Sequence, residues 1–254
     1  LQKRWWIFPS GRKKVFKVTT GSKAFDDLLG GRGLESRAIT EAYGAYGSGK
    51  TQLGSTLAVN VQMPLEKGGA NGKCVFIDTE GTFRPARIKQ ISEKLGANPE
   101  KVLQNILVAR AFNSDHQMLL LEKVGEMIKE GEPIKLVIVD SLTAHFRAEF
   151  AGRGQLADRQ QKLNRYMHDL MKLAETHNLA VYVTNQVMAN PAQMFGDPTT
   201  AIGGNIVGHA STYRIYLRRG KQGSRVAKLV DSPNLPDNET VFWVTDAGVG
   251  DDKP

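Results

Sequence analysis

Residues 44–51 constrain this chain more than any other stretch. They read Gly-Ala-Tyr-Gly-Ser-Gly-Lys-Thr and match the pattern G-x-x-x-x-G-K-[ST]. In this pattern the glycines let backbone N–H groups turn toward anionic oxygens, the lysine reaches the terminal phosphates, and the hydroxyl faces a metal ion. A strand-like run at 37–43 precedes the motif and a helix-like run at 52–61 follows it, so the sequence predicts a loop that binds a nucleoside triphosphate. A Gly/Ser turn that happens to precede a lysine is the alternative.

Length and composition limit what is attached to that loop. The chain has 254 residues, 41% of them hydrophobic, and no Pro/Gly/Ser-rich linker divides it, so one core domain is expected. A single cysteine, Cys74, lies in an apolar run and indicates a reducing compartment without a disulfide framework. Because no apolar run has membrane-spanning length and no secretory signal pattern is found, we expect a soluble intracellular protein. The net charge of +8 is compatible with a polyanionic partner or with a basic solvated surface.

The N-terminus is basic and aromatic. The first seventeen residues carry lysines and arginines but no acid, interleaved with Trp5, Trp6 and Phe8. Such a mixture either stacks on nucleic acid or packs its rings against the domain, and we favour packing. We therefore divide the chain into a basic aromatic arm, residues 1–16, and a core domain, residues 17–254.

The core alternates between short apolar runs and longer amphipathic runs. Strand-like runs lie at 73–78, 105–109, 134–140 and 180–184, and helix-like runs lie at 23–29, 85–95, 114–129 and 155–177. Run 134–140 is nearly all apolar, as a strand buried on both faces of a parallel sheet should be. Runs 211–217, 225–230 and 239–245 alternate with period two. The sequence therefore predicts an α/β fold with a mainly parallel central sheet flanked by helices and a C-terminal antiparallel β extension.

Three polar residues follow apolar strands at the sheet edge where the phosphate loop is expected. Asp140 ends a buried strand, where an ionised carboxylate needs a cation, and Mg²⁺ is the natural partner. Glu80 is placed to take a proton from an attacking water, and Gln186 is placed to sense the terminal phosphate. The alternatives are a loop-capping role for Asp140 and ordinary polar loop residues for Glu80 and Gln186. The predicted catalytic set is Lys50, Glu80 and Gln186, and the predicted metal side is Thr51 and Asp140.

Further runs along the chain resemble the RadA recombinases of archaea, which are relatives of bacterial RecA and of the eukaryotic strand-exchange proteins. These runs are TTGS at 19–22, GSGKTQ at 47–52, IDTEGTFRP at 77–85, ARAFN at 109–113, HFRAE at 145–149, RQQKL at 159–163, TNQV at 184–187 and IGGNI at 202–206. The likeness extends from about residue 17 to the C-terminus, in the family's order. It implies a RecA-like P-loop ATPase fold and an ATP-dependent filament on DNA that pairs a single strand with a homologous duplex.

The resemblance also implies roles for single residues. Glu80 would activate water, Asp140 would lie on the magnesium side, and Gln186 would couple the γ-phosphate to a DNA-binding loop. Arg87 is expected to stack on adenine. His209, which from the sequence alone would be a surface or structural histidine, would approach a neighbouring protomer's nucleotide. Asp231 would approach it too and would also hold a monovalent cation such as K⁺ there. The predicted nucleotide-binding residues are Gly44, Ala45, Tyr46, Gly47, Ser48, Gly49, Lys50, Thr51, Gln52, Arg87, His209 and Asp231.

DNA contacts are expected from two loops, at 142–154 and 187–208. Arginines bind phosphates in a salt-dependent way, and apolar side chains wedge between bases. Flexible surface loops with solvated arginines are the alternative. The predicted DNA-binding residues are Arg147, Phe150 and Arg153 in the first loop, Met194 and Phe195 in the second, and Arg214 and Arg218 beyond it.

The chain departs from the family's pattern at features that bear on assembly. Full-length members carry a helical DNA-binding domain and a Phe-x-x-Ala tether before the core. This chain shows neither, because its one matching run, at 83–86, belongs to the nucleotide site. In addition, Ala45 stands where a glutamate is common, and the turn at 30–34 is one residue longer. We expect ATP binding to survive. Filament assembly is expected of full-length members, and for this chain alone the sequence leaves it open.

The leading hypothesis is a cytoplasmic, nucleoid-associated, DNA-dependent ATPase of homologous recombination. Its expected ligands are ATP, Mg²⁺, and single- and double-stranded DNA, with recombinase-mediator proteins as further partners and no membrane contact. One alternative is a recombinase paralogue that binds ATP and a partner without strand exchange. A hexameric helicase motor on the same core is another.

Overall fold

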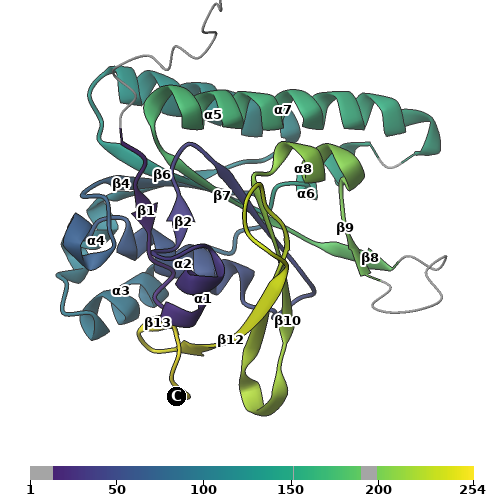
Figure 1. Ribbon diagram of the computed structural model, residues 1–254. Coiled ribbons are helices and arrows are strands. Elements are labelled where there is room, and N and C mark those ends of the chain that lie inside the picture. Colours follow the sequence, from purple (N-terminus) through teal and green to yellow (C-terminus); the bar gives the residue numbers. More distant parts are fainter. Residues whose placement is uncertain (1–13, 151, 190–198) are drawn as a thin grey trace, which may run out of the picture.

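The central sheet is mainly parallel, with an antiparallel extension. The computed structural model describes residues 14–150, 152–189 and 199–254 (Figure 1). Among these, nine strands form one sheet in the order β13-β12-β11-β10-β3-β7-β6-β4-β5. Their bounds are β3 (Ile39–Tyr43), β4 (Lys73–Asp78), β5 (Ile106–Arg110), β6 (Ile134–Asp140), β7 (Ala180–Asn185), β10 (Tyr213–Arg219), β11 (Arg225–Asp231), β12 (Asn238–Thr245) and β13 (Gly248–Gly250). Strands from β10 to β5 pair in parallel and strands from β10 to β13 pair antiparallel, which confirms the predicted arrangement.

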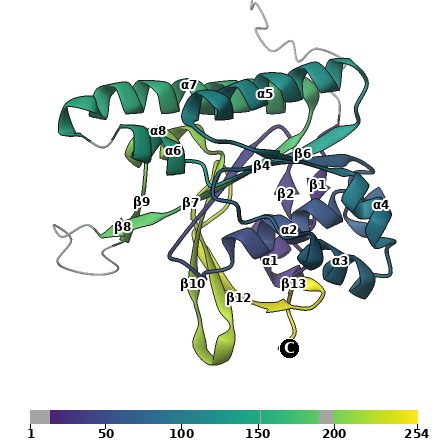
Figure 2. The ribbon, with the colours of Figure 1, turned by 180° about the vertical axis from the view of Figure 1, so that it is seen from behind.

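Helices cover both faces of the sheet (Figures 1 and 2). One face carries α1 (Lys23–Leu28), α2 (Lys50–Asn60), α3 (Pro85–Lys94) and α4 (Pro99–Gln104). The other carries α5 (Ser114–Lys129), α6 (Ala144–Glu149), α7 (Leu156–His177) and α8 (Gly204–Ala210). The core is therefore in two halves, separated by the sheet.

Strand β6 shows how an unbroken apolar run in the sequence predicts a strand that is buried on both faces of the sheet. Leu136 and Ile138 face the half built on α2, while Val137 and Val139 face the half built on α5 and α7. All four are fully buried. Because neighbouring residues point to opposite covered faces, the strand has no polar alternation, as in parallel sheets generally.

Local signals fix several helix boundaries. Ser22 caps α1, since its Oγ accepts the Phe25 N–H at 3.0 Å. Helix α3 begins at Pro85. Proline suits the first position of a helix because a backbone N–H there has no hydrogen-bond partner within the helix. Helix α4 was not predicted; its signals are Asn98, whose side chain accepts the Lys101 N–H, and the proline that follows.

The described parts of the two segments expected to be loops contain helices and strands, which corrects the prediction. The first, 142–154, contains α6 and the 3₁₀ turn η2 (Arg153–Gln155). The second, 187–208, contains β8 (Val187–Ala189), β9 (Thr199–Ala201) and α8, with β8 and β9 paired antiparallel. These helices and strands are too short for periodicity to reveal them. In α6 the ring of Phe146 is buried, and Glu149 accepts from Ser114 N at 2.6 Å.

The remaining described elements are short. Strands β1 (Lys17–Val18) and β2 (Leu34–Glu35) form a separate small sheet, and η1 (Leu65–Lys67) and η3 (Lys221–Gly223) are 3₁₀ turns. The basic aromatic arm, including Trp5 and Trp6, lies almost wholly outside the described residues. Within the described part of the chain, no helix is both long and apolar enough to cross a membrane.

Candidate nucleotide site

The predicted site residues converge at one edge of the sheet. Strands β3, β7, β6 and β4 are consecutive neighbours, and their carboxyl ends carry Gly44, Gln186, Asp140 and Glu80. An open pocket of about 1300 Å³ lies there. Its wall includes Gly44, Ala45, Tyr46, Gly47, Gly49, Lys50, Thr51, Gln52, Glu80, Arg87, Asp140 and Gln186. Ser48 is instead buried behind the loop.

The phosphate loop has the backbone geometry that its glycines predict. Gly47 has φ of 75° and Gly49 has φ of 104°, both in the left-handed region that side chains disfavour. A Cβ on Gly47 would also lie 2.4 Å from the guanidinium of Arg219 on the distant β10–β11 hairpin. Helix α2 begins directly after Gly49, without a side-chain cap. The N–H groups of its first turn are therefore available to an anion.

Lys50 is turned onto the loop itself. Its Nζ donates to the carbonyl oxygens of Gly44 at 2.7 Å and Ala45 at 2.9 Å. Burial lowers the pKa of Lys50 below its ordinary value, and the carboxylates of Asp140 and Glu80 oppose that shift. The ammonium group is thus held at the pocket wall, close to both acids.

Asp140 is a buried carboxylate surrounded by hydroxyls. It is 3% exposed, and it accepts hydrogen bonds from Thr51 Oγ1 at 2.7 Å, Thr82 Oγ1 at 3.1 Å and Thr184 Oγ1 at 2.5 Å. The peptide bond that follows it is cis. The described residues contain no cluster of three or more His, Cys, Asp or Glu side chains that would hold a metal ion. A metal beside Thr51 and Asp140 would need further ligands from a bound nucleotide, which is how Mg²⁺ is commonly held.

Glu80 and Gln186 are in direct contact. Gln186 Nε2 donates to Glu80 Oε1 at 2.8 Å, and Ser141 Oγ donates to the same oxygen at 3.3 Å. Glu80 and Gln186 are both exposed to the pocket. The structure therefore brings the predicted base and the predicted phosphate sensor together as one hydrogen-bonded pair.

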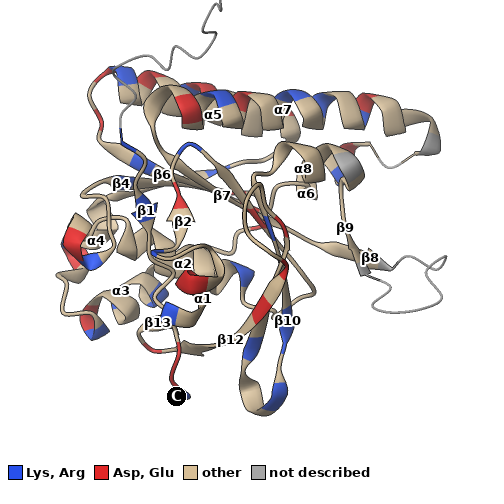
Figure 3. Cartoon of the chain, viewed as in Figure 1, with Lys and Arg blue, Asp and Glu red and all other residues tan. Residues whose placement is uncertain are grey.

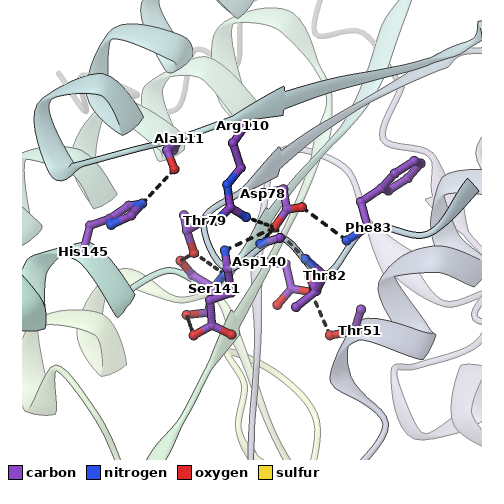
Figure 4. A network of polar contacts seen from close by, with 12 residues as sticks. Thr51, Asp78, Thr79, Thr82, Phe83, Arg110, Ala111, Asp140, Ser141 and His145 are labelled. Atoms are coloured by element: carbon purple, nitrogen blue, oxygen red, sulfur yellow. Dashed lines mark hydrogen bonds and ion pairs between the residues drawn. The ribbon is translucent and has the colours of Figure 1, made fainter.

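The loop that carries Glu80 is organised by a residue that the sequence analysis did not single out. The buried Asp78 carboxylate accepts the consecutive backbone N–H groups of Glu80, Gly81, Thr82 and Phe83, at 2.7–3.2 Å. Arg110 donates to the same carboxylate at 3.3 Å (Figure 4). The sequence could have indicated this role, because Asp78 is a charged residue that ends an apolar strand directly before a Thr-Glu-Gly-Thr turn.

Arg87, on α3, is part of the pocket wall. Its Nε donates to Gln52 Oε1 at 2.8 Å. Its other nitrogens donate to Gln90 and to the carbonyl oxygens of Thr245, at the end of β12, and Asp246, directly after it. Burial lowers the pKa of Arg87, with Asp246 opposing the shift. The guanidinium is held in place before any ligand enters.

His209 and Asp231 are not part of this chain's pocket wall. His209 is exposed on α8, and Asp231 is exposed at the end of β11. Their expected approach to a neighbouring protomer's nucleotide stays a prediction.

The predicted DNA-binding residues fall into distinct environments. Arg147 is exposed on α6, and Phe150 lies under the Lys162 ammonium at 5.4 Å. Arg218, on β10, pairs with Glu239, on β12, at 2.9 Å. Lys and Arg positions, coloured blue, mark the β10–β11 hairpin toward its tip (Figure 3). Met194, Phe195 and the side chain of Arg153 lie outside the described residues.

Arg214 differs from the other arginines. Its Nε donates at 2.8 Å to Glu41, which is fully buried, and its guanidinium lies 5.3 Å from the ring centre of Tyr43. A buried carboxylate needs such a partner. The structure thus pairs Arg214 inside the fold, and its predicted contact with DNA stays a prediction.

Comparison with known proteins fits this geometry. A protein-family model described as Rad51 matches residues 11–252. The chain belongs to the Rad51 family. It is similar to the DNA repair and recombination protein RadA of Methanocorpusculum labreanum, with 56% identity over 252 aligned residues that cover 94% of this chain and 76% of the relative.

Membership of the Rad51 family confirms several predictions. It confirms the RecA-like fold, the resemblance to RadA recombinases and the ATPase core. Rad51-family proteins are DNA-dependent ATPases of recombination and repair, so the predicted enzyme class, an ATP hydrolase, is confirmed as well. The family in general requires Mg²⁺ and forms filaments on DNA.

Proposed function

We propose that this chain binds and hydrolyses ATP in the pocket at the carboxyl edge of the sheet, and that it uses ATP to assemble on single-stranded DNA and exchange strands. The observation that carries the proposal is the convergence of Lys50, Glu80, Asp140 and Gln186 on one pocket of a Rad51-family chain.

The phosphate loop would bind the negatively charged phosphates of ATP. The Lys50 ammonium would leave the carbonyl oxygens of Gly44 and Ala45. Together with the N–H groups at the start of α2, it would then face the β- and γ-phosphates. Mg²⁺ fits beside Thr51 and Asp140, because a threonine hydroxyl and a buried carboxylate lie 2.7 Å apart there and both are oxygen ligands. When bound, Mg²⁺ would neutralise charge on the phosphate oxygens.

Glu80 is the proposed general base. Its carboxylate would orient a water and accept a proton from it while Lys50 stabilises the charge on the transferred phosphoryl group. Gln186 holds Glu80 in this structure, at 2.8 Å. Because Gln186 directly precedes β8, a γ-phosphate that competes for its amide would alter both the base and the hairpin that leads toward residues 190–198.

The DNA surface consists of the loop regions near α6 and the β8–β9 hairpin, with Arg218 on β10. Arg147 and Arg218 would contact phosphates, and Phe150 would contact bases. For Arg153, Met194 and Phe195 the role stays a prediction from the sequence. Arg214 is left out, because Glu41 engages it.

The inter-protomer roles concern His209 and Asp231. Both are exposed and lie away from this chain's own pocket, which suits residues that complete the site of a neighbour. Asp231 would hold K⁺ there. A K⁺-dependent ATPase rate that becomes K⁺-independent in Asp231→Asn would support this role, and an unchanged dependence would contradict it.

The domain division and location follow from the same function. We propose an arm, residues 1–16, on a core domain, residues 17–254, acting with the nucleoid DNA. Recombinase-mediator proteins are proposed as further partners.

The test of the proposed function is D-loop formation together with ATP hydrolysis in the presence of single-stranded DNA. Lys50→Ala should abolish both, because it removes the positive charge at the phosphate loop. A Lys50→Ala protein as active as its parent would refute the proposal.

The alternative is a paralogue that binds ATP and a recombinase partner without strand exchange. Sedimentation with ATP and single-stranded DNA separates the two functions. The recombinase should form large assemblies, and the paralogue should stay small.

A further inference from the structure

A fully buried amide, that of Asn185 at the end of β7, uses all of its hydrogen-bonding positions. Its Nδ2 donates to Glu41 Oε1 at 2.8 Å and to the Ile202 carbonyl oxygen at 2.5 Å. Its Oδ1 accepts from Thr143 Oγ1 at 2.9 Å and from the backbone N–H of Gln186 at 2.9 Å. An amide group has two N–H donors and two acceptor positions, so this side chain is saturated.

The partners of Asn185 lie on three separate parts of the fold. Glu41 is on β3, which leads directly into the phosphate loop. Thr143 directly precedes α6, in the first of the two segments expected to contact DNA, and Ile202 directly follows β9, in the second. One side chain therefore joins both of these segments to the strand that leads into the phosphate loop.

The hydroxyl of Thr143 is not used in its own helix. Thr143 stands at the N-cap position of α6, where a threonine hydroxyl commonly accepts a backbone N–H of the first turn. Its side chain makes no such bond, and the hydroxyl donates to Asn185 instead. The neighbouring backbone is also tied to β7, since Leu142 N donates to the Thr184 carbonyl oxygen at 2.8 Å. The start of the first segment is therefore anchored on β7.

Ile202 is held through both its N–H and its carbonyl group at the base of the β8–β9 hairpin. Its N–H donates to the Gln186 carbonyl oxygen at 3.0 Å, and its carbonyl oxygen accepts from Asn185 Nδ2. The residue is buried, and the hairpin continues beyond it with Val187 opposite Ala201. A shift of Asn185 would therefore move the base of the hairpin as well.

Glu41 fixes which way the Asn185 amide faces. Its carboxylate is fully buried and pairs with Arg214 at 2.8 Å. Turning the amide over would place Oδ1 against this carboxylate and against the Ile202 carbonyl oxygen, and would place Nδ2 against the Gln186 N–H. Each of these contacts would set like against like and leave buried polar groups without partners. Asn185 therefore has one orientation, in which the two segments are linked.

We propose that Asn185 is a positioning residue that couples the two DNA-contacting segments, so that α6 and the base of the β8–β9 hairpin adopt their DNA-binding arrangement together. The proposal rests on the proposed function, in which both segments contact DNA. Asn185 is buried and acts through Thr143 on one side and Ile202 on the other. Weakening one link should therefore lower DNA affinity and also loosen the segment at the other end.

The test variant is Thr143→Val, which removes one hydroxyl and keeps the shape of the side chain. Asn185 Oδ1 still accepts from Gln186 N, so that buried oxygen keeps a partner. Labelled oligo(dT) should bind the full chain, loaded with Mg-AMP-PNP, roughly 2–10-fold more weakly, which is the effect of one hydrogen bond. AMP-PNP itself should bind within about twofold of the parent.

The salt dependence separates positioning from direct contact. In Thr143→Val, the slope of the logarithm of the oligo(dT)-binding constant against the logarithm of the salt concentration should equal that of the parent, because no phosphate contact is lost. Thr143→Ser keeps the hydroxyl and should restore the affinity. A changed slope would overturn the positioning role.

Hydrogen exchange measures the link itself. Thr143 reaches the β9–α8 region through Asn185, so peptides that cover residues 199–210 should exchange faster in Thr143→Val than in the parent, and Thr143→Ser should restore the parent's exchange. Peptides that cover α2 should be unchanged. A hydroxyl that only stabilised α6 would alter exchange around α6 alone.

The matched control is Ser36→Ala, because Ser36 is another fully buried hydroxyl. Its Oγ donates to Asn178 Oδ1 at 2.9 Å and accepts from Phe16 N at 3.0 Å. Ser36 precedes β3, at the opposite end of that strand from the phosphate loop. Ser36→Ala should lower the urea midpoint while leaving oligo(dT) affinity and the exchange of residues 199–210 as in the parent.

Two results would overturn the coupling. One is a Thr143→Val protein with the parent's oligo(dT) affinity or the parent's exchange at residues 199–210. The other is an equal change in Ser36→Ala, which would make general stability the cause. A parent that binds neither AMP-PNP nor oligo(dT) would refute the proposed function and this proposal with it, which separates the two failures.

Discussion

Asp78 offers a sharp test of how the hydrolysis loop is built. Its Oδ1 accepts from Gly81 N at 2.7 Å and from Glu80, Thr82 and Arg110 at longer distances, and its Oδ2 accepts from Phe83 N at 3.2 Å. Asp78→Asn keeps one carbonyl oxygen and places an amide group where the other oxygen was. The substitution therefore removes the charge and leaves one backbone N–H facing another donor.

The cost follows from those contacts. A hydrogen bond to a charged group contributes about 1.5–3 kcal/mol, so losing one and weakening the others should cost about 2–3 kcal/mol of unfolding free energy. Arg110 adds little to this, since its side chain is 42% exposed and solvent screens the pair. For a chain of this size the Tm should fall by roughly 5–10 °C.

The assay combines urea unfolding with ATP hydrolysis. Asp78→Asn should lower the urea midpoint with an unchanged slope and should also lower hydrolysis, because Glu80 loses its fixed position. Glu80→Gln is the matched control, since it should lower hydrolysis while leaving the urea midpoint near that of the parent. An Asp78→Asn protein with the parent's stability and hydrolysis rate would refute this account of the loop.

Three further predictions concern charge and burial. Arg214→Ala should lower the free energy of unfolding, measured with urea, by about 3–5 kcal/mol because it leaves Glu41 buried and unpaired. Arg218→Ala removes a partner from an exposed pair, so it should lower the free energy of unfolding by less than about 1 kcal/mol and weaken DNA binding. Equal losses of stability in the two variants would contradict these assignments. Arg147→Ala should weaken DNA binding and reduce, by about 1, the slope of the logarithm of the DNA-binding constant against the logarithm of the salt concentration. An unchanged slope would show that Arg147 does not contact DNA phosphates. Burial raises the pKa of the Cys74 thiol, so the folded protein should resist thiol labelling at pH 8. The neutral thiol's contribution to the free energy of unfolding should be lost as the pH rises above the unfolded thiol's pKa of about 8.5. Rapid labelling of the folded protein would argue against a buried Cys74.

The sequence was most informative where one signal dominated. The bounds of α5, β4 and β6 agree with the predicted ranges, because a long amphipathic period or an unbroken apolar run had no competing interpretation. The phosphate loop and the residues at the strand ends were likewise predictable, since carboxyl ends of neighbouring parallel strands must meet at one edge.

The contacts between distant segments could not be predicted. Arg214 and Arg218 lie on one strand, yet only Arg214 meets the buried Glu41, because that depends on the parallel pairing of β10 with β3. Asp246 meets Gln90 only because the antiparallel extension folds back over α3. Neither pairing leaves a periodic trace in the sequence.

The central claim, that Glu80 activates water in a pocket that binds ATP, is tested most directly by ATP hydrolysis with and without single-stranded DNA. The parent should show DNA-stimulated hydrolysis. Glu80→Gln should bind ATP with an affinity within about threefold of the parent but hydrolyse it about 100-fold or more slowly under both conditions. A Glu80→Gln protein that hydrolyses ATP at the parent's DNA-stimulated rate would contradict the account.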